Sequence, residues 1–341
     1  MTRQGKLITR RHALLGGAVS LGALALGPSV APVLAKAPLV GQPAPYFYRF
    51  KFGDGEVTVV SDGTLPLGDP HTNFTGLTAT EMDRQLTDNF LPLTNAVLEQ
   101  NVLILNTGNK LVLFDTGMGT SKMFGPTTGK LMQTIKQAGI DPKDVDAVVM
   151  SHAHIDHCGG CMAADGSRNF PNAQYYISQA DYDYWTDEKT VGPKLKAFLD
   201  QARNNLVPNR ERMIFFKDGE EFLPGIQALS APGHTIGHQC LYEPHRKLLI
   251  SGDHVLGDIT PNIASWTDDS DMLGTYFASL VATALLEVAL VLPGHRRTLR
   301  NLRDRIQELK AHHRQRLDEA LGLVQARPRT VYETASLMKW E

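Results

Sequence analysis

Cysteine is scarce in this chain, with three in 341 residues. Three cysteines are too few for a disulfide scaffold, so a packed core has to hold the fold together. An excess of one charge is also missing. The formal net charge is −2, and no overall field attracts the chain to nucleic acid or to an anionic membrane. With 42% hydrophobic and 21% charged residues, the composition is typical of a globular protein with one large domain and an appendage.

A long apolar segment is missing too. The apolar run from Ala13 to Leu26 is rich in glycine and alanine and falls short of the about 20 residues that a membrane span needs. It follows Thr9-Arg10-Arg11 and precedes small residues up to Ala37, which is typical of a twin-arginine signal peptide. Residues 1–37 are therefore predicted to be such a signal, and the mature protein is expected in the periplasm without stable membrane insertion. An uncleaved anchor or a disordered tail is the alternative.

What the chain does contain is a cluster of histidines, Ser151-His152-Ala153-His154-Ile155-Asp156-His157, directly after an apolar run. Alternation along an extended segment puts His152 and His154 on one face. The turn that follows brings Asp156 and His157 round to a second position nearby. Imidazole nitrogens and carboxylate oxygens suit zinc and its divalent neighbours, so the stretch predicts a metal site. A histidine-rich surface loop is the alternative.

The elements around this cluster alternate between strand and helix patterns. Hairpins are predicted at residues 46–63 and 97–114, from β-branched alternation interrupted by glycine turns. Helices are predicted at residues 78–89 and 192–204, and another after Gly159-Gly160. Strands followed by a helix and a ligand-bearing strand indicate a layered α/β architecture.

Three further ligand candidates each follow a strand-like run and a glycine. They are His234 in Pro232-Gly233-His234, Asp253 in Ser251-Gly252-Asp253, and His295 in Pro293-Gly294-His295. The glycine lets the backbone turn sharply at the end of each strand. Polar residues presented by several strand ends are how sites in α/β proteins are usually assembled.

His-X-His-X-Asp-His followed by Gly-His, Gly-Asp and Gly-His resembles the metallo-β-lactamase superfamily of dinuclear metal hydrolases. The resemblance covers most of residues 46–300, and it implies a four-layer αββα sandwich for residues 38–300. Residues 301–341 are then expected to form a C-terminal helical extension. The segments around Ser61-Asp62-Gly63 and Asp115-Thr116-Gly117 resemble the methyl parathion hydrolase and quorum-quenching lactonase branch. Leu292-Pro293-Gly294-His295 resembles thioesterase-like and lactonase-like members.

The resemblance also implies how the ligands divide between two divalent ions. One ion would take three imidazoles, the other two imidazoles and a carboxylate, and a further carboxylate would bridge them. In that order, the ligands are His152, His154 and His234; His157, His295 and Asp156; and Asp253. Zinc is expected, with manganese, iron or cobalt as alternatives. Two ions about 3.5–4 Å apart can hold a shared hydroxide at neutral pH, and Asp156 is the candidate catalytic residue that passes a proton to the leaving group.

Other side chains near these motifs have two possible interpretations. Asp62 and Asp115 either orient a ligand imidazole or serve as turn residues. His238 either approaches the pocket or forms a structural hydrogen bond. Cys158 and Cys161 have the spacing of a redox or zinc pair, but packing thiols are the simpler interpretation.

The pocket wall is expected from three stretches, Met118 to Phe124, Tyr182 to Trp185 and Leu256 to Trp266. Their apolar residues would suit a small substrate with an apolar acyl or aryl part. Lactones or esters, of the acyl homoserine lactone type, are the favoured substrates, and organophosphate triesters are a further possibility. Thioesters and β-lactams are alternatives on the same fold, and a metal-binding protein without hydrolysis is the alternative of another class. No nucleic-acid partner is expected, and the family suggests a homodimer.

Overall fold

The computed structural model describes residues 46–73, 77–265 and 271–338, all within one compact unit, Ala44–Glu341. The predicted signal peptide, residues 1–37, lies outside the described residues, so its export function stays a prediction. No helix among the described residues is long and apolar enough to cross a bilayer.

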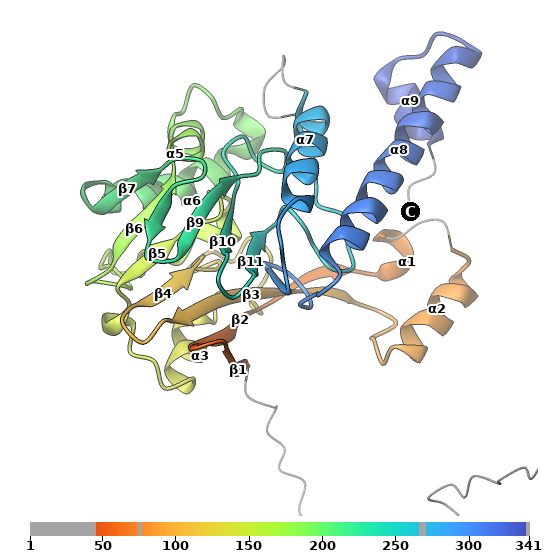
Figure 1. The fold of residues 1–341 in the computed structure, drawn as a ribbon. Helices are drawn as coiled ribbons and strands as arrows, with labels where there is room; N and C mark the ends of the chain where they lie inside the picture. Colours follow the sequence, from red (N-terminus) through yellow and green to blue (C-terminus); the bar gives the residue numbers. More distant parts are fainter. Residues whose placement is uncertain (1–45, 74–76, 266–270, 339–341) are drawn as a thin grey trace, which may run out of the picture. The chain divides into compact units, whose positions relative to one another are not determined.

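Two sheets form the centre of the unit (Figure 1). The first contains β1 (Phe47–Phe52), β2 (Gly55–Gly68), β3 (Ala96–Asn106), β4 (Leu111–Phe114), β5 (Ala147–Val149), β6 (Gln174–Ser178) and β7 (Met213–Phe216), in that spatial order. The second contains, in spatial order, β12 (Leu290–Pro293), β11 (Leu248–Gly252), β10 (Gln239–Glu243), β9 (Ile226–Ser230) and β8 (Glu221–Leu223). Strands β1 to β4 pair antiparallel, and β4 to β7 pair parallel. In the second sheet only the pairing of β11 with β12 is parallel.

Helices connect and cover these strands. They are α1 (Pro70–Asn73), α2 (Ala79–Asp88), α3 (Leu131–Gln137), α4 (Ile155–Cys158), α5 (Gln179–Thr186), α6 (Lys196–Leu206), α7 (Met272–Ala284), α8 (Leu302–Ala326) and α9 (Val331–Leu337). Figure 1 shows α5 and α6 beside the first sheet and α7 and α8 beside the second.

Adjacent residues of the central strands face different cores, as expected from the period of two. Ile104 packs in a cluster with residues of α3, α5 and α6, whereas Leu105 packs in the cluster between the two sheets. Ile250 of the second sheet also lies between the sheets, and its neighbour Leu249 packs outward against α7 and α8. The layers therefore run helix, sheet, sheet, helix, which confirms the predicted αββα sandwich.

Most predicted elements are present. The two hairpins are formed by β1 with β2 and by β3 with β4, and the helices predicted at 78–89 and 192–204 correspond to α2 and α6. The helix predicted after Gly159-Gly160 is wrong, because these residues lead into turns and extended chain. The Gly160 N–H donates instead to Thr116 Oγ1 at 3.0 Å, and this bond holds the loop against the end of β4.

The C-terminal residues are helical, as expected. The first turns of α8 are part of the fold's core, since Leu302, Ile306 and Leu309 are buried in the cluster outside the second sheet. Later residues of α8 are largely exposed, including Leu317 and Leu321. A domain boundary near residue 300 stays a prediction.

Candidate metal centre

The seven predicted ligands lie together at the ends of four strands. The histidine motif follows β5 of the first sheet. His234, Asp253 and His295 follow β9, β11 and β12 of the second sheet. All seven residues are at most 9% exposed. Their assembly therefore draws on both halves of the sandwich.

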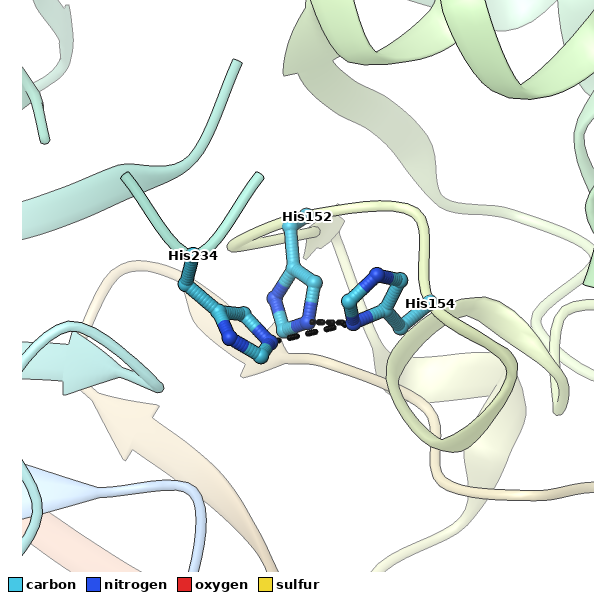
Figure 2. A group of neighbouring side chains, drawn as sticks. All are labelled: His152, His154 and His234. Atoms are coloured by element: carbon cyan, nitrogen blue, oxygen red, sulfur yellow. Dashed lines mark hydrogen bonds between the residues drawn. The ribbon is translucent and has the colours of Figure 1, made fainter. Parts of the chain in front are cut away.

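Three imidazoles form the first group (Figure 2). His154 Nδ1 lies 3.0 Å from His152 Nε2 and 3.0 Å from His234 Nε2. Burial, reinforced by neighbouring imidazoles, lowers the pKa of His152 and His154 well below the usual value. Burial also lowers the pKa of His234. All three rings are therefore neutral near pH 7, and their nitrogens converge on one point.

A second group combines carboxylates with imidazoles. Asp156, His157 and His295 offer ligand atoms within 4.8 Å of one another. The Oδ2 atom of Asp253 lies 3.3 Å from His295 Nε2, 3.6 Å from His157 Nε2 and 3.5 Å from His234 Nε2. One oxygen of Asp253 thus reaches imidazoles of both groups.

The charges of the second group differ from those of the first. Burial alone would lower the pKa of His295, but the charge of Asp253 and the hydrogen bond with Asp156 outweigh it and raise this pKa to about 10. Burial opposes the shift of His157 as well, yet the three nearby carboxylates raise its pKa well above the usual value. For Asp156 and Asp253, burial would raise the pKa, but the two imidazoliums hold it below the usual range. Without metal, this half consists of two cations and two anions.

Four of the five imidazoles are oriented through the Nδ1 nitrogen. His157 Nδ1 donates to Asp115 Oδ2 at 2.9 Å, and His152 Nδ1 donates to Ser151 Oγ at 3.0 Å. Backbone carbonyls accept the other two bonds, at 2.7 Å from His234 to Asn262 and at 3.1 Å from His295 to Glu99. A proton fixed on Nδ1 leaves Nε2 of a neutral ring as the ligand atom. Metal-binding histidines are usually held in this way.

The donor set fits divalent metal ions. The nitrogens of the three imidazoles in the first group lie close enough to one another for a single cation to bind all three. Two buried atoms of the second group, His157 Nε2 and Asp253 Oδ1, lack a hydrogen-bond partner in the described part of the chain. Such buried polar atoms are costly unless a ligand completes them. Imidazole and carboxylate donors are those that zinc and similar ions take.

The two aspartates with open interpretations differ in role. Asp115 orients the predicted ligand His157 through its hydrogen bond to Nδ1. It also accepts hydrogen bonds from the backbone N–H and the hydroxyl of Ser151. Its backbone has a φ of +64°, a conformation that aspartate tolerates better than most residues. Asp62 instead accepts backbone N–H bonds from Met118, Gly129 and Leu131, so it organises the neighbouring loop.

His238 is a buried hydrogen-bonding residue behind Asp253. Its Nε2 accepts the Asp253 N–H at 3.1 Å. The chain approaches closely here, since a Cβ on Gly252 would lie 2.8 Å from His238 Nε2 and 2.7 Å from the Ser151 Cβ. Gly252 also has a φ of +48°, so only glycine fits without strain. The structural interpretation of His238 is therefore the better one.

The cysteines are packing residues. Cys158 and Cys161 are free and fully buried, as is Cys240 apart from 1% exposure. Burial raises the pKa of the Cys161 thiol to about 12. These thiols are therefore neither a disulfide nor a zinc pair in this structure.

The predicted pocket wall divides between core and surface. Met118 and Trp185 are fully buried, while Met123 is 49% exposed. Trp266 lies outside the described residues.

Sequence reasoning missed Phe198, whose ring centre lies 5.8 Å from that of His154. No spacing signal linked α6 to the histidine motif, because the contact is tertiary.

Comparison with known proteins agrees with this site. Residues 96–295, which include all seven side chains, match the metallo-beta-lactamase superfamily. The lactamase-like protein adaB of Aspergillus niger is 26% identical over 228 residues, which cover 66% of this chain and 58% of that protein. An N-acyl homoserine lactonase of Bacillus cereus is 25% identical over 214 residues, which cover 56% of this chain and 79% of that protein.

Among solved structures, a similar one is that of AidC, described as a dizinc quorum-quenching lactonase in complex with the product N-hexanoyl-L-homoserine. It has 25% sequence identity and a TM-score of 0.60, and the match covers 73% of this chain and 90% of that chain. The match to adaB, by contrast, spans only 58% of that relative's length.

Proposed function

Because the chain belongs to the metallo-beta-lactamase superfamily, we propose that it is a dinuclear metal-dependent hydrolase of lactone or ester bonds. Acyl homoserine lactones are the favoured substrates. The observation that carries this proposal is the shared carboxylate, because Asp253 Oδ2 lies 3.5 Å from His234 Nε2 and 3.3 Å from His295 Nε2. A carboxylate between two groups of donors can contact two ions and keep them close despite their mutual repulsion. The similarity to proteins described as N-acyl homoserine lactonases supports the substrate class.

In this proposal, each ion has its own three protein ligands. His152, His154 and His234 would hold one ion, and Asp156, His157 and His295 would hold the other. Asp253 would contact both. When bound, such ions polarise the carbonyl of a lactone and lower the pKa of water toward neutrality. Zinc fits the donor set.

The chain itself supplies orientation and proton transfer. Asp115 and the carbonyls of Asn262 and Glu99 hold the imidazoles in one tautomer, so little reorganisation is needed during the reaction. Asp156 is the proposed catalytic residue. Its Oδ2 lies 3.4 Å from His295 Nε2. Because this carboxylate is ionised, it would take the proton that the attacking water gives up and pass it to the leaving alkoxide as the lactone ring opens.

Apolar rings beside the first group suit an acyl chain. Phe198 is partly buried and packs against the core cluster next to His154. The buried Trp185 lies beside it, with its ring centre 4.9 Å from that of His154 and 6.1 Å from that of Phe198. An acyl chain placed along Phe198 would bury apolar surface worth about 0.8 kcal/mol per CH₂ group. Such a surface favours acylated lactones over small polar esters.

The test compares kcat/KM of the zinc-loaded protein on a long-chain acyl homoserine lactone and on a dimethyl aryl phosphotriester, with a chelated sample as control. We expect a lactone value larger by orders of magnitude and loss of activity on chelation. A preference for the phosphotriester, or activity unaffected by chelation, would contradict the proposal.

A variant of the shared carboxylate tests the dinuclear part. Asp253→Ala is expected to lower zinc content and abolish lactone hydrolysis while the far-ultraviolet circular dichroism stays unchanged. Asp258→Ala is the matched control, because Asp258 lies in the same loop region but pairs with Arg297 at the surface. Full activity of Asp253→Ala would refute the dinuclear assignment.

A further inference from the structure

A carboxylate that the sequence reasoning missed lies directly behind the three-histidine group. Asp181 is fully buried in the first turn of α5. Its Oδ2 accepts the Ala153 N–H at 2.9 Å and the Thr235 hydroxyl at 3.0 Å. Its Oδ1 accepts the Gly237 N–H at 2.9 Å. The carboxylate therefore bonds to two loops that are distant in the sequence. Ala153 in the first loop and Thr235 in the second are 82 residues apart.

These two loops carry the first group of ligands. Ala153 lies between His152 and His154, and Thr235 directly follows His234. Two of the three bonds to Asp181 therefore fix a backbone or side-chain group within one residue of a ligand. The third comes from Gly237, three residues after His234. Loss of the carboxylate would leave two buried N–H groups without an acceptor, which would destabilise the native positions of both loops.

The second loop also packs tightly against α5. A Cβ on Gly237 would lie 2.3 Å from Ser178 Oγ and 2.5 Å from the Asp181 N–H nitrogen. Ser178 in turn caps α5, because its Oγ accepts the Asp181 N–H at 3.1 Å. The loop that follows His234 thus packs closely against the capped first turn of α5.

We infer that Asp181 is a positioning residue for the three-histidine half of the metal centre, joining the His152–His154 loop to the His234 loop at the spacing that one ion needs. The inference rests on the proposed metal site but not on the substrate. It assigns Asp181 no contact with the second half, whose ligands Asp156, His157 and His295 are held by other partners.

The decisive experiment compares Asp181→Asn with Asp62→Asn. Asp62 is a matched control, since it is also fully buried and also accepts three hydrogen bonds, all from backbone N–H groups of a loop without ligands. Asparagine keeps the volume of aspartate and turns one acceptor into a donor, which opposes the N–H groups it faces. Both variants are expected to lower the melting temperature.

Zinc affinity separates the two variants. Competition with a chromophoric chelator should give Asp181→Asn one zinc dissociation constant raised about 10- to 100-fold, the usual effect of losing a group that supports metal ligands. The dissociation constant of the other zinc ion should stay within a factor of about two of the wild-type value. Asp62→Asn should keep both constants. Hyperfine-shifted imidazole N–H signals of the cobalt-loaded protein identify which half is weakened.

A milder variant keeps the test informative if Asp181→Asn does not fold. Thr235→Val removes only the hydroxyl bond to Asp181 and should weaken the same half to a smaller extent. Wild-type affinities in both variants, equal weakening by Asp62→Asn, or weakening of the half that contains His295 would each overturn the inference. A wild-type protein that binds no zinc would instead refute the proposed function.

Discussion

Metal binding should release protons from one half of the centre and not from the other. His295 has a pKa of about 10 in the metal-free chain, and the pKa of His157 is raised well above its usual value. At pH 8 both rings are therefore cationic, and each must lose a proton before Nε2 can bind an ion. The lowered pKa values of His152, His154 and His234 mean that the other half binds without proton loss.

About two protons should leave the imidazoliums when both ions bind at pH 8, and ionisation of a water bound by the ions would add about one more. The affinity of the half containing His295 should then rise about 100-fold per pH unit near pH 8 from the imidazoliums, since each released proton contributes a factor of ten. The affinity of the three-histidine half should change little between pH 7 and 9. Isothermal titration calorimetry in two buffers of different ionisation enthalpy measures the proton count.

A matched pair of variants locates the protons. His295→Gln should reduce the count by about one, while His154→Gln should leave the release from the second half intact. A count near zero, or equal release from both halves, would refute the charge assignment of the metal-free site.

Three shorter predictions follow from other parts of the structure. The thiols of the three cysteines are buried and the pKa of Cys161 is about 12, so a thiol reagent at pH 8 should label none of them until the chain is unfolded; labelling of the native protein would contradict their burial. Gly252→Ala would bring its Cβ within 2.7 Å of Ser151 and should lower zinc content after dialysis, whereas Gly322→Ala, with no atom within 4 Å of its Cβ, should not. Leu113→Ala removes a fully buried side chain and should reduce the unfolding free energy in urea by about 2–5 kcal/mol; a loss below about 1 kcal/mol would mean that this core repacks.

Much of the fold was predictable because its signals are local. Alternation in β3 and β4 and the glycine turn between them marked a hairpin. The helix predicted at residues 78–89 corresponds to α2, which the structure shows to begin with a capping box between Thr78 and Glu81. The helix expected after Gly159-Gly160 failed for a tertiary reason. Its glycines serve close contact with the Thr116 loop, and no local pattern distinguishes that use from a helix start.

The candidate site shows the same division. Each predicted ligand follows a strand and a turn, so its place at a sheet edge could be inferred from the sequence. Asp181 and Phe198 could not, because each reaches the site from a helix whose position is set by packing against the first sheet. Asp181 also belongs to an ordinary helix start, where an acidic residue near a serine cap indicates nothing beyond the helix itself.

The ligands follow strands of both sheets, and this affects the rate at which the protein unfolds and is degraded. An ion held by His154 and His234 joins the first sheet to the second across the edge of the sandwich. Separation of the sheets then requires release of the ion, so the unfolding rate becomes dependent on free zinc. We expect proteases to degrade metal-depleted chains first, so that the surviving population is enriched in molecules able to act.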